Sequence, residues 1–313
     1  MVIYMPNYSK KVISSFKKIV RDLAAQKSSL NLVANASVDF TRNRKLPLSD
    51  MLLLIVFMSA KPIKEELFDY FDFSLATASS SAFVQARDKI LPDAFESLFH
   101  NVNDAFSYSK TYHDYRLIAV DGSDLPISYD PKDTETLQGL SDEHNGHNQY
   151  HINAAFDILN NCYTDAIVNS ATHSAEQESM WRMVERYKGS KAIFIADRSY
   201  ATWNNMEHIK HAGQFFLIRA KDISSNGLLK KFKLPDGEFD VDIDTILTTR
   251  QTNEVKENPD TYRFLSSSST FDFIDKDTSF YTVNYRLCVL KSMVKKNMNR
   301  SFLTYLESCL LLI

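Results

Sequence analysis

The chain is poor in cysteine, glycine and proline, with 3, 7 and 8 of these among its 313 residues. Cys162, Cys288 and Cys309 are scattered, without a Cys-x-x-Cys pair or a mixed His/Cys cluster. This spacing supports neither a zinc site nor a disulfide framework. The scarcity of glycine and proline argues against a disordered or low-complexity chain.

Targeting segments and several common catalytic motifs are also missing. No basic stretch precedes an apolar segment at the N-terminus, which argues against secretion and favours a reducing cytoplasm. The apolar run from Met51 to Met58 is too short to span a bilayer, so we predict a buried helix and no membrane contact. Neither G-x-S-x-G nor a P-loop occurs, so hydrolase-triad and P-loop nucleotidase functions lack support.

Charge is nearly balanced overall but unevenly distributed. The net charge is −3 and the pI about 6.2, so the whole chain has no basic signature for nucleic acid. Residues 1–60 nevertheless hold nine Lys and Arg against three Asp, a net charge of +6, which leaves −9 for the remainder. A basic N-terminal arm is compatible with DNA contact, and a solvated helix face explains it equally well.

The first 110 residues have the periodicity of helices. Apolar residues recur at helical spacing within 9–26, and further helical patterns begin near Pro47, Pro62 and Pro92. We expect Ser49 or Asp50 to cap the second of these helices. The polar segment with Arg87 and Lys89 is a candidate for a helix that enters a DNA groove. An exposed helix of a bundle is the alternative.

Two apolar stretches each end in an aspartate. Leu117 to Val120 is followed by Asp121, and Ala192 to Ala196 is followed by Asp197. We predict two strands that carry these carboxylates at their C-terminal ends. If the strands are neighbours, both carboxylates meet at one edge, where hard oxygen ligands suit Mg²⁺ or Mn²⁺. The alternative is that each Asp caps the segment that follows it.

The residues around these strands predict a mixed α/β fold. We expect a hairpin at 151–159 and 162–170 turning at two Asn, helices at 176–187 and 203–211, and a strand at 214–219. We predict a helical, DNA-binding region at 1–110, a core at 111–221, a β-rich insertion at 222–290 and a divergent tail at 291–313. The sequence pattern indicates no element against which the tail would pack.

The ordered combination of these motifs carries a family resemblance. Val-Asp121-Gly-Ser, then the hairpin, then Ala-Asp197-Arg-Ser-Tyr200 resembles the DDE transposases of bacterial insertion sequences. It is similar to the group whose RNase H-like core is interrupted by a β-strand insertion. The Ser-x-Phe-Val-Gln-x-Arg pattern that ends at Arg87 also resembles this group, and the likeness spans roughly residues 40–287.

The resemblance implies a function and a site. It implies metal-dependent cleavage of double-stranded DNA at transposon ends and transfer of the 3′ hydroxyl to target DNA, in the bacterial cytoplasm at the nucleoid. A homodimer is among the implied partners. Asp121 and Asp197 would be catalytic and would ligate two Mg²⁺ or Mn²⁺ ions. Arg198 and Tyr200 match the family motif, and their implied roles are DNA contact or packing around the turn.

The sequence departs from the family in two places. Ser199 stands where the family has Gly, which would cost stability if the position needed a positive φ. The family's Tyr-x2-Arg-x3-Glu-x6-Lys motif is absent, because Glu307, the one Glu after Glu257, has no matching Arg or Lys.

We therefore expect a C-terminally truncated transposase whose second metal site is incomplete and which is inactive alone. One alternative is a non-catalytic DNA-binding remnant that binds transposon ends or interferes with an intact transposase. Another is a decaying product that does not fold stably.

Overall fold

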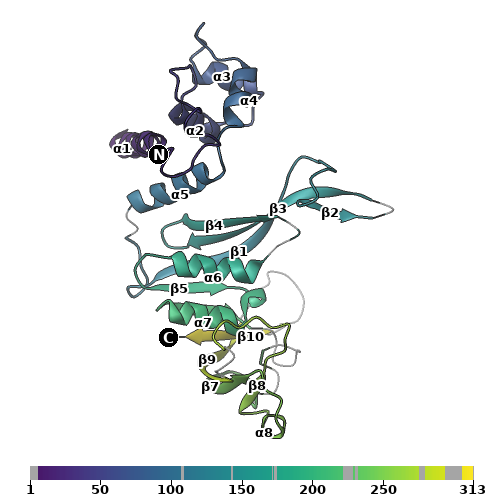
Figure 1. Ribbon diagram of the computed structural model, residues 1–313. Coiled ribbons are helices and arrows are strands. Elements are labelled where there is room, and N and C mark those ends of the chain that lie inside the picture. Colours follow the sequence, from purple (N-terminus) through teal and green to yellow (C-terminus); the bar gives the residue numbers. More distant parts are fainter. Residues whose placement is uncertain are drawn as a thin grey trace, which may run out of the picture. The chain divides into compact units, whose positions relative to one another are not determined.

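The computed structural model describes residues 6–106, 109–141, 144–170, 172, 175–220, 228–229, 232–274, 279–292 and 305–312 (Figure 1). Two compact units make up the chain, one from Met1 to Tyr108 and one from Ser109 to Ile313. No helix in the described ranges is long and apolar enough to cross a membrane.

The first unit is helical, as predicted. Two small cores hold it together: one around Val20, Leu52 and Leu98, and one around Met51 and Phe83. Its helices are α1 (Pro6–Ala25), α2 (Leu48–Phe57), α3 (Ile63–Tyr70), α4 (Ser80–Arg87) and α5 (Asp93–Ala105).

The start of α2 differs from the prediction. Neither Ser49 nor Asp50 caps it, because the helix begins at Leu48 and Pro47 takes the N-cap position without a side-chain hydrogen bond. The Pro47 carbonyl accepts from the Asp50 and Met51 amides instead, at 3.1 and 3.0 Å. By contrast, α4 has a side-chain cap, since Ser79 Oγ accepts from the Ala82 amide at 3.2 Å.

The second unit is built on one large mixed sheet, with the order β2-β3-β1-β5-β6-β10-β9-β7-β8 and β4 paired to β3. Strand β1 pairs with β3 in the antiparallel sense and with β5 in the parallel sense. The strands are β1 (Arg116–Pro126), β2 (Leu137–Leu140), β3 (Asn145–Asp157), β4 (Cys162–Ser170), β5 (Ala192–Ala196), β6 (Phe215–Arg219), β7 (Phe239–Thr248), β8 (Tyr262–Phe264), β9 (Phe280–Ser292) and β10 (Tyr305–Leu312).

Two helices cover one face of this sheet. Figure 1 shows α6 (Glu176–Arg186) and α7 (Trp203–His211) side by side over the central strands. Met180 and Met183 of α6 are fully buried in the same core as Ile118 of β1 and Phe194 of β5. A short helix η2 (Arg198–Tyr200) follows β5, and α8 (Asn253–Glu257) lies between β7 and β8. The prediction of a mixed α/β fold is confirmed.

The predicted hairpin is also confirmed, with one change of length. Strand β4 has the predicted bounds, and Asn161 in the turn has a positive φ of 54°. Strand β3 begins at Asn145 rather than at His151, because its first half continues outward to pair with β2.

Strand β1 is longer than predicted. We expected it to end at Asp121, but it continues to Pro126 because β3 pairs with it as far as Pro126 opposite Gln149. The parallel partner β5 pairs only from Arg116 to Val120. Asp121 therefore lies beyond the end of the parallel ladder but inside the antiparallel one.

The C-terminal residues that are described pair with the sheet. Strand β10 lies between β6 and β9 and is antiparallel to both, although the sequence pattern indicated no partner for the tail. The rest of the predicted tail, residues 293–304 and 313, lies outside the described part of the chain. Strands β7, β8 and β9 fall in the region predicted to be β-rich.

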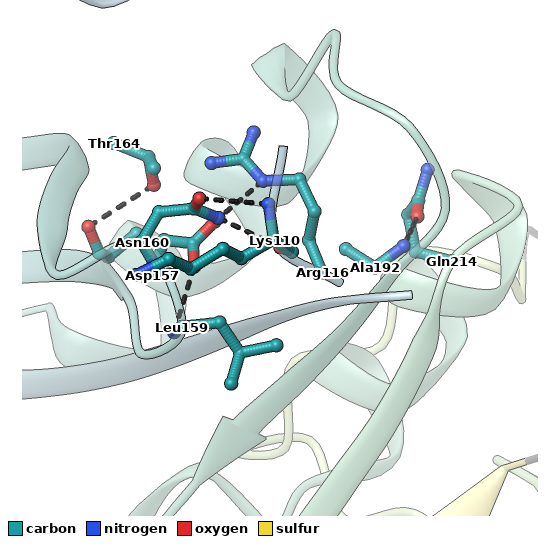
Figure 2. Close-up of polar contacts among 9 residues, drawn as sticks. Lys110, Arg116, Asp157, Leu159, Asn160, Thr164, Ala192 and Gln214 are labelled. Carbon is teal, nitrogen blue, oxygen red and sulfur yellow. Dashed lines mark hydrogen bonds and ion pairs between the residues drawn. The ribbon is translucent and has the colours of Figure 1, made fainter. Parts of the chain in front are cut away.

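A buried ion pair ties β1 to the hairpin. Asp157 at the end of β3 is fully buried, and its Oδ2 accepts from Arg116 Nε at 2.7 Å (Figure 2). Its Oδ1 accepts from the amides of Leu159 and Asn160 at 3.1 and 2.9 Å. Asn160 also bonds to Lys110, so one carboxylate orders the turn, the start of β1 and the segment before it.

We expect Asp157→Asn to destabilise the second unit by about 3–5 kcal/mol, because it leaves the Arg116 guanidinium buried without its counter-charge. Urea unfolding followed by circular dichroism measures this. Arg182→Ala is the matched control, since Arg182 pairs with Glu178 on the exposed side of α6 and should leave the midpoint nearly unchanged. Equal midpoints for the two variants would contradict a special role for Asp157.

Candidate active site

The two predicted aspartates lie on neighbouring parallel strands. The last register pair between β1 and β5 is Val120 with Ala196, and Asp121 and Asp197 are the residues that directly follow. Both side chains are exposed. The fold thus brings two carboxylates to one edge of the sheet, as the sequence predicted.

Neither carboxylate acts as a helix cap. Asp197 has extended backbone before η2, and its side chain makes no capping hydrogen bond. Its backbone carbonyl accepts from the Tyr200 amide at 3.0 Å, which closes the turn. Asp121 Oδ1 accepts from the Gly122 amide at 2.9 Å. Both side chains therefore retain exposed oxygens for a ligand.

Tyr200 is buried and does not present its ring to a DNA surface. It is 1% exposed and packs in the core beneath α6 and α7. Its hydroxyl donates to Asn153 Oδ1 at 3.3 Å, and its carbonyl accepts from Asn205 Nδ2 at 3.2 Å. These contacts support the packing role. Burial raises its pKa, and the nearby carboxylates of Glu176, Asp121 and Asp197 raise it further.

The other residues of this turn are exposed. Arg198 is exposed, so it is available to a polyanion. Ser199 is also exposed and does not have a positive φ, so the family's Gly is not needed for backbone conformation here. Its carbonyl accepts from Gln177 Nε2 at 3.2 Å, which connects the turn to the first residues of α6.

The remaining predicted DNA contacts lie in the first unit. Arg87, the last residue of α4, pairs with Asp88 at 3.2 Å. Lys89 pairs with the largely buried Asp39 at 3.1 Å. Both cations are partly neutralised by acidic neighbours, which reduces the attraction that each offers to phosphate.

Sequence reasoning missed a polar cluster beside Asp121. His151 of β3 is 7% exposed, and its Nδ1 lies 2.8 Å from Asp124 Oδ1. Its Nε2 lies 3.3 Å from Glu176 Oε1, at the start of α6, without the geometry of a hydrogen bond. The hydrogen bond from His151 lowers the pKa of Asp124. Strand register places Asp124 opposite His151, and no spacing in the sequence signals this pairing.

The donor chemistry of this edge fits a hard divalent cation. Carboxylate oxygens are the ligands that Mg²⁺ and Mn²⁺ prefer. Asn153 Nδ2, fully buried beside Tyr200, has no hydrogen-bond partner in the structure. In the described ranges, however, no three His, Cys, Asp or Glu side chains are grouped closely enough to hold an ion as they stand. Glu307, the late glutamate, lies on strand β10 rather than on a helix.

Comparison with known proteins identifies the domain. The family model described as a transposase DDE domain matches residues 112–265, from the segment before β1 to the end of β8. No curated protein matches the chain.

Gly122 is required for the packing beside Asp121. A Cβ there would lie 2.7 Å from His151 Nε2 and 3.0 Å from Glu176 Oε1. We expect Gly122→Ala to destabilise the fold by about 1–3 kcal/mol, because the buried imidazole has little room to move. Chemical denaturation measures this, with Ser123→Ala, at the exposed next position, as the control. A Gly122→Ala variant as stable as the control would show that the cluster rearranges freely.

Proposed function

The matched region makes this chain a member of the DDE transposase family, and from that premise we propose that it cleaves and joins DNA at the ends of an insertion sequence. The parallel register that brings Asp121 and Asp197 to one edge is the observation that supports this most. Its partners would be transposon-end and target DNA in the bacterial cytoplasm. A homodimer at the nucleoid is part of the same proposal.

The site residues would act by binding positively charged metal ions next to a DNA phosphate. The family generally uses divalent metal ions. When bound, such ions stabilise the attacking and leaving oxygens of a displacement at phosphorus. Asp121 and Asp197 would hold them, because their carboxylates are exposed on a rigid edge. Arg198, exposed in the turn after β5, would attract the DNA backbone toward this edge.

We further propose that the 313-residue chain by itself cleaves DNA poorly. The family's Glu-bearing motif is not in the sequence. Two carboxylates alone bind two metal ions only weakly. A poorly held second ion gives little stabilisation to the leaving oxygen. Binding of metal and DNA can persist where cleavage does not.

We expect the pure chain to bind Mn²⁺ in calorimetry, and Asp121→Asn to weaken that binding by about tenfold or more, since a ligand loses its charge. Asp236→Asn, an exposed position away from the site, is the control. On a transposon-end duplex with Mn²⁺, strand cleavage should be close to background. Strong cleavage that depends on Asp121 would refute the predicted inactivity, and absence of Mn²⁺ binding would refute the metal-dependent function itself.

A second candidate function is DNA binding without chemistry, and a cavity in the first unit favours it. This cavity of about 680 Å³ lies between the segment before α2 and helix α4 with the residues that flank it. Four of its lining residues are basic: Arg42, Arg44, Lys45 and Lys89. Arg42 and Arg44 make no ion pair within the described residues, so their charge is available to phosphate.

We expect Arg42→Ala/Arg44→Ala to weaken duplex binding and to reduce the slope of log affinity against log salt by about 2, one unit for each lost phosphate contact. Fluorescence anisotropy with a labelled duplex at several salt concentrations measures both. Lys61→Ala/Lys64→Ala removes two cations from the same unit outside the cavity and should leave the slope closer to that of the wild type. A double Arg variant with the wild-type slope would exclude this cavity as a DNA contact.

A further inference from the structure

We propose that Asn205 is a positioning residue of the candidate site, which fixes the turn that carries Asp197 and so supports cation binding by that carboxylate. This inference rests on the proposed function and adds a residue that acts through the backbone without touching the cation. Asn205 lies in the first turn of α7, and its side chain is fully buried.

The place of the Asp197 carboxylate depends on the backbone of its turn. The side chain is exposed and makes no capping hydrogen bond. Strand β5 ends at Ala196, so the ladder with β1 stops one residue short of Asp197. The Asp197 carbonyl accepts from the Tyr200 amide at 3.0 Å, which closes the turn. A contact that fixes the Tyr200 backbone therefore also fixes the backbone from which this carboxylate projects.

Asn205 fixes the Tyr200 backbone from inside the core. Its Nδ2 donates to the Tyr200 carbonyl at 3.2 Å in a fully buried contact. Its backbone amide donates to Thr202 Oγ1 at 3.2 Å, which holds Asn205 itself in place. A hydrogen bond shielded from water is stronger than an exposed one. The bond from Gln177 to the Ser199 carbonyl, which holds the same turn from α6, lies at the surface.

Helix capping alone does not explain this contact. At the third position of a helix, a side chain that completes a capping box accepts from the backbone amide of the N-cap residue. Thr202 is the N-cap residue of α7, and its amide donates to the Tyr200 carbonyl at 2.9 Å instead. The Asn205 side chain donates to that same carbonyl. Both contacts are therefore directed at the turn after β5 rather than at the end of α7.

The side-chain amide of Asn205 is not the residue that stability alone favours. Its Oδ1 is buried and has no hydrogen-bond partner among the described residues, which costs stability. A leucine of similar shape would remove this unpaired atom, and the Tyr200 carbonyl would still accept from Thr202. A local choice that costs stability is expected at a functional position. The amide therefore serves the geometry of the turn more than the stability of the core.

The test compares Asn205→Leu with Asn204→Leu in the full chain, by Mn²⁺ calorimetry, thermal melting and hydrogen exchange. Asn204 is also buried in α7, but its side chain bonds to Asp272, outside the turn. We expect Asn205→Leu to melt near the wild-type temperature, to weaken Mn²⁺ binding by about tenfold and to exchange faster in a peptide covering residues 197–202. Asn204→Leu should melt at a lower temperature and keep the wild-type Mn²⁺ affinity.

The outcomes separate this inference from the proposed function. Wild-type Mn²⁺ affinity in a folded Asn205→Leu, with loss in Asp121→Asn, overturns the positioning role and leaves the function standing. A lower melting temperature of Asn205→Leu with unchanged affinity assigns Asn205 to stability alone and equally overturns the inference. Asn205→Ser, too short to reach the Tyr200 carbonyl, decides the same question if the leucine variant does not fold. If the wild type binds no Mn²⁺, both proposals fail.

Discussion

The buried pair of Arg116 and Asp157 is the constraint on which the candidate site depends. It holds the first residue of β1 against the last residue of β3, and so sets the register of these two strands. A slip of one residue would turn Asp121 to the opposite face of the sheet, because side chains alternate along a strand. The Asp157 carboxylate that secures this register is shielded from water. It also accepts hydrogen bonds from the turn amides of Leu159 and Asn160.

Given that register, three elements form the site and its surroundings. Strand β1 supplies Asp121, and the parallel strand β5 ends where Asp197 begins. Helix α6 then lays its first turn over Gly122, whose missing side chain makes the close approach of Glu176 possible. Asp121 and Asp197 are thus held by rigid strands, and rigid support is what a metal site requires.

The sequence predicted those parts of the site that depend on short continuous stretches of residues. Apolar runs ending at Asp121 and Asp197 identify two strands and their carboxylates, and alternation of helix and strand identifies the fold class. What depends on pairing was not predictable: Asp124 meets His151 only through the β1–β3 register, and β1 extends to Pro126 only because β3 does. Burial of Tyr200 likewise follows from the packing of α6 and α7, which no residue near the turn reveals.

The parallel contact of β1 with β5 also has a kinetic consequence. The hairpin of β3 and β4 joins residues that are close in the chain, whereas β3, β4 and α6 all lie in the chain between Val120 and its partner Ala196. Contacts of large sequence separation form slowly, because loop closure must precede them. We therefore expect the carboxylate edge to form later than the hairpin. A cation that binds there stabilises the fully folded chain over species in which only the hairpin has formed.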